Sequence, residues 1–168
     1  MGSEFKLTLC LTNSDSLSNA FKNGWKEIDR VEKLISSWII SSEVSRINQA
    51  AGIHAVIVSK ELYQLLRYSK EIYQLTQGAF DLTIKPALNI WNWKTGKIPS
   101  NKEISKAKNL VGFQNIIFND SIFSVFLPKK GMLLDLGGIG KGYASWCVAE
   151  LWKRNGITEG AINAGGDL

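Results

Sequence analysis

An amphipathic pattern near the start of the chain constrains the fold most strongly. Phe21, Trp25, Ile28 and Ile35 recur at the spacing of one helix face, with further apolar residues beside them. This spacing predicts a long helix over residues 16–36 that buries one face. Such a helix needs an apolar surface from other elements to pack against, so the rest of the chain must provide one.

Shorter patterns along the rest of the chain predict helices mixed with strands. Ser59 can cap a helix that ends before Gly78, and Ser100 with Glu103 forms a capping-box pattern. A further helix is expected over residues 142–155. The remaining predictions are strands at residues 53–58, 115–118, 122–127 and 132–136 and from residue 161, and a loop at residues 41–48. This order predicts an α+β fold with a mixed, largely antiparallel sheet and flanking helices.

Composition limits the class of protein. Of the 168 residues, 45% are hydrophobic and 21% are charged, which is typical of an ordinary globular domain and excludes disorder and coiled coil. The net charge of +5 comes from scattered lysines, so a solvated surface is favoured over a nucleic-acid-binding patch. The apolar run at the start is too short for a secretory signal, so residues 1–15 are expected to be a tag or leader remnant.

Cysteine and histidine are too few for several common kinds of site. Cys10 and Cys147 lie far apart without a Cys-x-x-Cys pattern, so neither a zinc site nor a disulfide framework is expected. The single histidine, His54, sits in a short apolar run. A Ser-His-Asp triad or a two-histidine metal site is therefore not expected either.

A glycine-rich segment after a predicted strand is the strongest local signal for a ligand. Residues 135–143 read Asp-Leu-Gly-Gly-Ile-Gly-Lys-Gly-Tyr and lead into a predicted helix. Backbone N–H groups at a helix N-terminus bind phosphate, and Lys141 adds a positive charge. The spacing fits neither a P-loop nor a Rossmann turn. From the glycines alone, a phosphate site and a tight packing turn are equal alternatives.

Two further segments are weaker signals when each is taken alone. Trp38, after the first helix, could stack on a flat ring or close the core as a hydrophobic lid, and the lid is favoured. Residues 76–83 read Thr-Gln-Gly-Ala-Phe-Asp-Leu-Thr, and in them Asp81 has no distinctive context. Neither segment predicts a function by itself.

Together, these segments resemble motifs of one known family. Their types and order are similar to those of the FAD:protein FMN transferases (flavin transferases, ApbE). The matching stretches are Ser36–Asn48, Thr76–Thr83 with the following Pro86 and Trp91, Asp135–Ala144, and Asn163–Asp167. The resemblance runs from about Phe21 to Leu168, and several motifs in register are more specific than any one of them.

The resemblance implies an ApbE-like flavin transferase fold and a reaction. Such enzymes bind FAD and, with Mg²⁺, transfer its FMN half to a Thr or Ser hydroxyl of an acceptor flavoprotein, and AMP leaves. Acceptors carry a Ser/Thr-Gly-Ala-Ser/Thr pattern, which residues 77–80 do not match. The implied location is the periplasm, or the outer face of the bacterial inner membrane, often as a lipoprotein. Membrane association is expected only through an anchor missing from this sequence.

The resemblance also assigns residues, while the catalytic residues and general base stay unknown. Gly138 is expected to offer its carbonyl oxygen to Mg²⁺. The expected FAD-binding residues are Trp38, Ala79, Phe80, Asp81, Asp135 and Lys141.

The sequence departs from the family pattern at both ends. No Met-Gly-Thr segment precedes Phe21, and family members continue past the Gly-Gly-Asp motif with a His segment that His54 does not match. Residues 16–168 are thus expected to be the first half of such a domain. One carbonyl with Asp135 and Asp167 does not fill an octahedral Mg²⁺ shell, so weak or no transfer is expected from this chain alone.

Three other functions stay open at this point. If water replaces the acceptor hydroxyl, the protein is an FAD pyrophosphatase that makes FMN and AMP. If flavin binds without turnover, it is a non-catalytic flavin-binding module. If the glycines only make turns, it is a structural domain.

Overall fold

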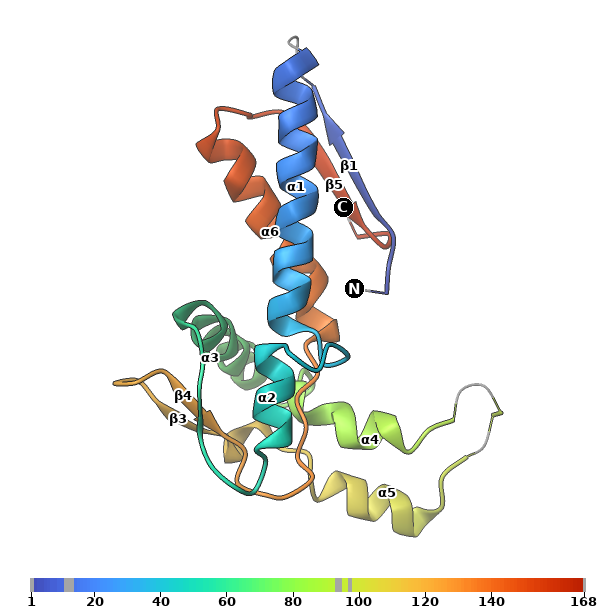
Figure 1. The fold of residues 1–168 in the computed structure, drawn as a ribbon. Helices are drawn as coiled ribbons and strands as arrows, with labels where there is room; N and C mark the ends of the chain where they lie inside the picture. Colours follow the sequence, from blue (N-terminus) through green and yellow to red (C-terminus); the bar gives the residue numbers. More distant parts are fainter. Residues whose placement is uncertain (1, 11–13, 93–94, 97, 168) are drawn as a thin grey trace. The chain divides into compact units, whose positions relative to one another are not determined.

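The computed structural model describes residues 2–10, 14–92, 95–96 and 98–167. These form two compact units, each described by itself. Unit 1 combines Met1–Leu34 with Gly137–Leu168, and unit 2 is Ile35–Leu136. Both units mix helices with antiparallel strands (Figure 1), which confirms the predicted α+β class. No helix within the described ranges is long and apolar enough to cross a bilayer.

Unit 1 packs two long helices against a two-stranded antiparallel ribbon. The elements are α1 (Ser14–Ile35), α6 (Gly137–Arg154), β1 (Phe5–Leu9) and β5 (Gly160–Ala164). The ribbon pairs Phe5 with Ala164 at one end and Leu9 with Gly160 at the other. Its core is formed by the buried Ala20, Ile28, Val148 and Trp152, with partly buried apolar residues of both strands packed against them.

The buried face of α1 includes the predicted Ile28 and Ile35 but not the predicted Trp25. Trp25 is 43% exposed, whereas Gly24 is buried. A Cβ atom on Gly24 would lie 3.1 Å from a methyl group of Leu7 and 3.4 Å from the Trp152 ring. The helix therefore presents a small residue to these two large side chains, and a rule based on apolar residues alone places Trp25 instead of Gly24 on the buried face.

Two boundaries in unit 1 differ from the sequence expectations. Residues 5–9 fall in the segment set aside as a tag or leader remnant, yet they form β1 within the fold. Their alternating burial matches the period of two that a strand requires. Helix α6 begins at Gly137 rather than at residue 142, so the glycines expected in a turn form its first turns.

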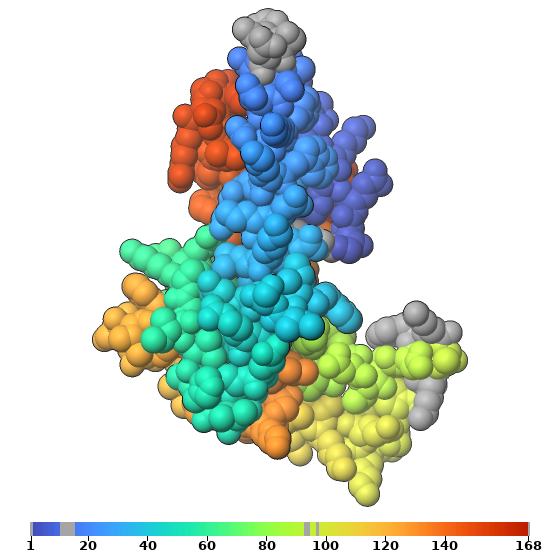
Figure 2. Space-filling model, in the orientation of Figure 1, coloured from blue at the N-terminus to red at the C-terminus, as the bar shows by residue number. Residues whose placement is uncertain are grey.

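Unit 2 surrounds a three-stranded antiparallel sheet with short helices. The sheet order is β2–β4–β3, with Val125 of the central strand opposite both Val56 and Phe118. Figure 2 shows the segment around α2, in light blue to cyan, at the surface of this unit. The elements in chain order are α2 (Glu43–Gln49), β2 (Val56–Ile57), α3 (Lys60–Leu75), η1 (Leu82–Ile84), α4 (Lys85–Asn89), α5 (Asn101–Lys108), η2 (Phe113–Asn115), β3 (Ile117–Asn119) and β4 (Ser124–Phe126).

Side-chain caps fix the helix ends of unit 2 as predicted. The hydroxyl of Ser59 accepts from the Leu62 amide at 3.2 Å, and Ser100 with Glu103 forms the full capping box. Gly78 follows α3 in the left-handed region at φ +85°, where glycine avoids the strain of a side chain. These three local predictions are confirmed.

Two predictions for unit 2 are wrong. The expected loop at residues 41–48 is largely the helix α2, capped by Ser42 and anchored by the buried Val44 and Ile47. Residues 132–136, all described, form no strand. Their polar backbone groups find other partners: the Asp135 amide donates to the carbonyl oxygen of Leu82 at 2.8 Å.

The hairpin of β3 and β4 packs against α3 through Tyr63. The Tyr63 ring lies 5.7 Å from the Phe118 ring and 5.3 Å from the Phe123 ring, centroid to centroid. Its hydroxyl donates to Asp120 at 2.7 Å. Burial, followed by the hydrogen bond and charge of Asp120, raises the pKa of Tyr63 to about 12.

We expect this pKa to make stability depend on pH above 10. The folded pKa exceeds the unfolded value of 10, so the contribution is complete below pH 10 and is lost as the pH rises toward 12. Urea unfolding at pH 9 and pH 11 should show a larger loss for the wild type than for Tyr63→Phe. In Asp120→Asn, absorbance titration at about 295 nm should show the Tyr63 pKa shifted down, toward 10. Equal losses in wild type and Tyr63→Phe would contradict this assignment.

Candidate functional site

A buried lysine organises the surface around Trp38 in unit 2. Lys85, the first residue of α4, is 8% exposed. Its ammonium group donates to the Ser37 hydroxyl at 2.7 Å and to Asp135 Oδ2 at 3.0 Å. The Ser37 hydroxyl in turn donates to the same carboxylate oxygen at 3.2 Å. We call Ser37, Trp38, Lys85 and Asp135 the Trp38 cluster.

The Trp38 ring lies over this buried charge and faces outward. The Lys85 ammonium group lies 4.5 Å from the ring centroid, within the range of a cation–π interaction. The side chain is nevertheless 83% exposed. A hydrophobic lid on the core would be buried, so the favoured interpretation of Trp38 is wrong. The ring is instead available to a planar ligand.

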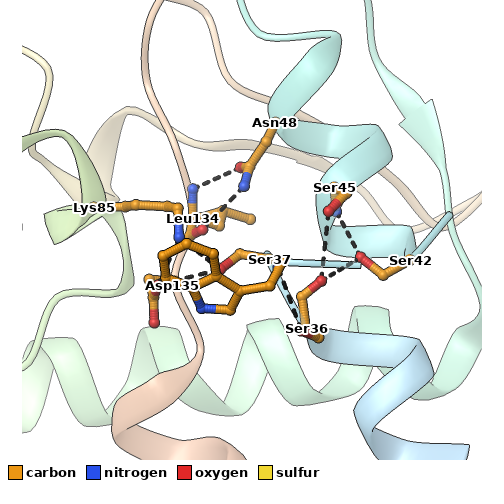
Figure 3. Close-up of polar contacts among 9 residues, drawn as sticks. Ser36, Ser37, Ser42, Ser45, Asn48, Lys85, Leu134 and Asp135 are labelled. Carbon is orange, nitrogen blue, oxygen red and sulfur yellow. Dashed lines mark hydrogen bonds and ion pairs between the residues drawn. The ribbon is translucent and has the colours of Figure 1, made fainter. Parts of the chain in front are cut away.

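The segment from Ser36 to Asn48 holds this cluster in place (Figure 3). The Ser42 hydroxyl donates to the Ser36 carbonyl oxygen at 2.6 Å and accepts from the Ser45 amide at 2.9 Å. The Asn48 side chain accepts from the Leu134 amide at 2.6 Å and donates to the Leu134 carbonyl oxygen at 3.0 Å. Because Asp135 follows directly, these bonds fix the carboxylate next to Ser37.

The side chain of Asp81, a predicted FAD-binding residue, makes hydrogen bonds within unit 2. Its Oδ1 accepts from the amide and hydroxyl of Thr83 at 2.7 and 2.6 Å, and its Oδ2 accepts from the Phe113 amide at 3.1 Å. The Thr83 hydroxyl then accepts from the Gly112 amide at 2.7 Å. Asp81 therefore ties the turn before η1 to the segment that begins η2.

Ala79 and Phe80 lie in the turn between α3 and η1. The Ala79 amide donates to the Thr76 carbonyl oxygen at 3.0 Å, and the Phe80 amide donates to the Thr76 hydroxyl at 3.1 Å. Ala79 is exposed and Phe80 is half-buried. Their amides thus shape the turn, which leaves Ala79 at the surface.

Unit 1 contains the other predicted residues, Gly138 and Lys141. Both lie in the first turns of α6, where helix amides lack partners within the helix itself. The Lys141 ammonium group pairs with Asp167 Oδ2 at 3.2 Å. Asp167 follows a tight turn in which Gly165 and Gly166 both have positive φ. The structure therefore brings the Gly-Gly-Asp motif to Lys141.

The residues expected to hold Mg²⁺ do not form a complete metal site. The Gly138 carbonyl oxygen lies in a helix, where carbonyl oxygens accept from the amide four residues later. Among the described residues, no three His, Cys, Asp or Glu side chains are grouped so that they could hold a metal ion. Mg²⁺ in proteins usually keeps several waters and takes only one or two carboxylates, with substrate phosphates as further ligands.

Lys85 is the site residue that the sequence analysis missed. A lysine directly before Pro86, inside an apolar stretch, is unusual because lysine is rarely buried without a partner. Its position at the start of a helix was also detectable, because proline favours the first helical turn. The partners Ser37 and Asp135 are distant in sequence, so no local pattern could have named them.

Comparison with known proteins finds similar sequences along the whole chain. A model of the ApbE family matches residues 1–168. A Klebsiella pneumoniae (strain 342) protein named FAD:protein FMN transferase is 32% identical over 170 residues, which cover all of this chain and 52% of that protein. The protein of that name from Escherichia coli (strain K12) is 27% identical over 148 residues, or 84% of this chain and 42% of that protein.

Solved structures show the same fold. The ApbE protein of Thermotoga maritima superposes with a TM-score of 0.87 at 27% identity, covering 98% of this chain and 54% of that one. The flavin transferase ApbE of Vibrio cholerae gives 0.83 at 22% identity, covering 99% and 55%. The predicted fold class is confirmed, and the family match includes residues 1–20, which the motif resemblance did not reach. The chain spans about half the length of the curated relatives it matches.

We expect loss of the Asp81 carboxylate to destabilise unit 2. Asp81→Ala leaves the buried amide of Phe113 and the fully buried Thr83 without their acceptor, so unfolding should become easier by about 2 kcal/mol or more. Urea denaturation followed by circular dichroism measures this. Glu71→Ala on the exposed side of α3 is the control and should change stability by less than about 0.5 kcal/mol. Equal stability of the two variants would contradict the role given to Asp81.

Proposed function

The chain belongs to the ApbE family, and from this membership we propose that it forms the flavin-binding part of an FAD:protein FMN transferase. The proposed reaction moves FMN from FAD onto a Thr or Ser hydroxyl of an acceptor flavoprotein and releases AMP. The new bond joins the hydroxyl oxygen to the FMN phosphorus. The bond that breaks joins this phosphorus to the oxygen that leaves with AMP, and the hydroxyl proton leaves to a base.

The exposed Trp38 ring over the buried Lys85 carries the proposal. A planar aromatic surface that is 83% exposed suits the isoalloxazine ring of a flavin, because offset stacking of two aromatic planes removes both from water. The cation below the ring and the Asp135 carboxylate beside the cation give this surface a fixed polar support. These features support flavin as the ligand of the Trp38 cluster.

The start of α6 supports a phosphate-binding role in unit 1. The exposed Gly137 and Gly138 carry no side chain that would block approach to the first turn of α6, and a helix N-terminus favours a negative charge. Lys141 adds a positive charge there, although its pairing with Asp167 partly offsets it. In a transfer from FAD, negative charge builds up on the leaving AMP phosphate, and such groups stabilise it.

Three parts of the proposal rest on the family resemblance. Mg²⁺ would stabilise charge on the two phosphates, with Gly138 as one ligand, and the described residues do not complete its shell. The acceptor would carry a Ser/Thr-Gly-Ala-Ser/Thr pattern. The location would be the periplasm or the outer face of the bacterial inner membrane.

We expect substitution of Trp38 to weaken FAD binding without unfolding the protein. Trp38→Ala removes the stacking surface, so the Kd for FAD should rise roughly tenfold or more. Quenching of flavin fluorescence during titration measures the Kd. Trp25→Ala, which removes a partly exposed tryptophan on α1, is the matched control and should leave the Kd unchanged. If the two variants bind FAD equally well, flavin does not stack on Trp38.

We further expect this chain by itself to transfer FMN weakly or not at all, because its described residues include no group of three His, Cys, Asp or Glu side chains that could hold a metal ion. Incubation with FAD, Mg²⁺ and an acceptor peptide, followed by chromatography for AMP and mass spectrometry of the peptide, measures transfer. FMN and AMP without labelled peptide would identify a pyrophosphatase. Binding without products in a longer protein containing this chain would identify a flavin-binding module. Efficient labelling by the chain alone would contradict the expectation.

A further inference from the structure

The burial of Lys85 needs an explanation beyond stability. An ammonium group that is largely removed from water loses hydration, and replacing a buried ion pair with apolar residues often leaves a protein as stable or more stable. The position is thus unfavourable for a cation unless nearby groups compensate it.

The groups that compensate Lys85 come from separate segments that are themselves held firmly. Asp135 is fixed because its own amide donates a hydrogen bond to the Leu82 carbonyl oxygen and because Asn48 pairs with the backbone of the preceding Leu134. Ser37 donates to that carboxylate. The ammonium position is therefore set by two oxygen atoms at 2.7 and 3.0 Å, and it does not depend on the Trp38 ring.

The orientation of the Trp38 ring, in contrast, depends on its contact with the Lys85 ammonium group. Trp38 is 83% exposed, and its amide donates to the Ser36 hydroxyl at a long 3.3 Å. An exposed side chain of this kind has free rotation about its side-chain bonds unless a contact selects one position. The charge 4.5 Å from the ring centroid is such a contact, and it leaves the opposite face of the ring open.

We propose that Lys85 is a positioning residue that pre-orders the Trp38 ring for stacking on the flavin. This inference rests on the proposed function and adds a residue to it. Without the ammonium group, part of the binding free energy would be used to order the ring, so affinity would fall although Lys85 does not touch the ligand. In this role, Lys85 affects FAD affinity only when the Trp38 ring is present. A general contribution of Lys85 to stability would affect affinity with or without the ring.

A double-mutant cycle in the intact protein tests this dependence. Lys85→Met should raise the Kd for FAD roughly 3- to 30-fold when Trp38 is present, from the usual strength of cation–π contacts. In a Trp38→Ala background, the same change should alter the Kd less than about twofold. Lys85→Arg keeps a cation under the ring and should retain most of the affinity. Lys70→Met, which removes the cation 5.6 Å from the Phe118 ring, is the matched control and should leave the Kd unchanged.

A second readout needs no ligand. The heteronuclear NOE of the Trp38 indole N–H, assigned by its loss in Trp38→Phe, should fall in Lys85→Met and stay near the wild-type value in Lys85→Arg. Two results would contradict the role of Lys85 and leave the proposed function in place. One is an equal change in the Kd for FAD when Lys85→Met is made with and without Trp38. The other is an unchanged NOE in Lys85→Met while FAD still binds. Absence of FAD binding by the wild-type protein would instead overturn the proposed function. If Lys85→Met does not fold, Lys85→Gln replaces it in both measurements. We expect the Kd for FAD to rise and the NOE to fall in this variant as well.

Discussion

The pairing of the Asn48 side chain with the backbone of Leu134 is the contact on which the arrangement of unit 2 around Trp38 depends. Residues 132–136 form no strand but bury apolar side chains, including the fully buried Met132 and Leu134. Buried backbone groups need partners, and in a sheet a neighbouring strand supplies them. Here one amide side chain on α2 serves both polar groups of Leu134. This fixes Asp135, and Asp135 in turn fixes Lys85.

Features of the fold that depend on residues close together in the chain could be predicted from the sequence. Features that depend on residues far apart in the chain could not. The caps at Ser59 and Ser100 and the glycine at 78 act over a few residues, and their predictions are confirmed. The expected strand at 132–136 is wrong because an apolar pattern reports burial, whereas a strand requires a partner of the right geometry. The partner is Asn48, which is 86 positions away.

The same distinction applies to the site. The exposed Trp38 and the fixed Asp135 lie in motifs that the sequence analysis found, and the structure places them around one buried ammonium group. Lys85 was missed because its significance depends on burial and on two partners that no local pattern names. The glycines of residues 137–142 were found but were assigned to a turn, since glycine lowers helix propensity while tertiary context places it in α6 all the same.

Residues within one motif therefore have different physical tasks. Ser42, Asn48 and Asp81 have side chains that bond to backbone groups, so their substitution should act on stability first. Trp38 has little contact with the core, so its substitution should act on ligand binding first. Lys85 shares a property with each group. It is buried, and its ammonium group also contacts the exposed Trp38 ring. Within one motif, we therefore use the hydrogen-bond partners and exposure of each side chain to predict whether its loss acts first on stability or on ligand binding.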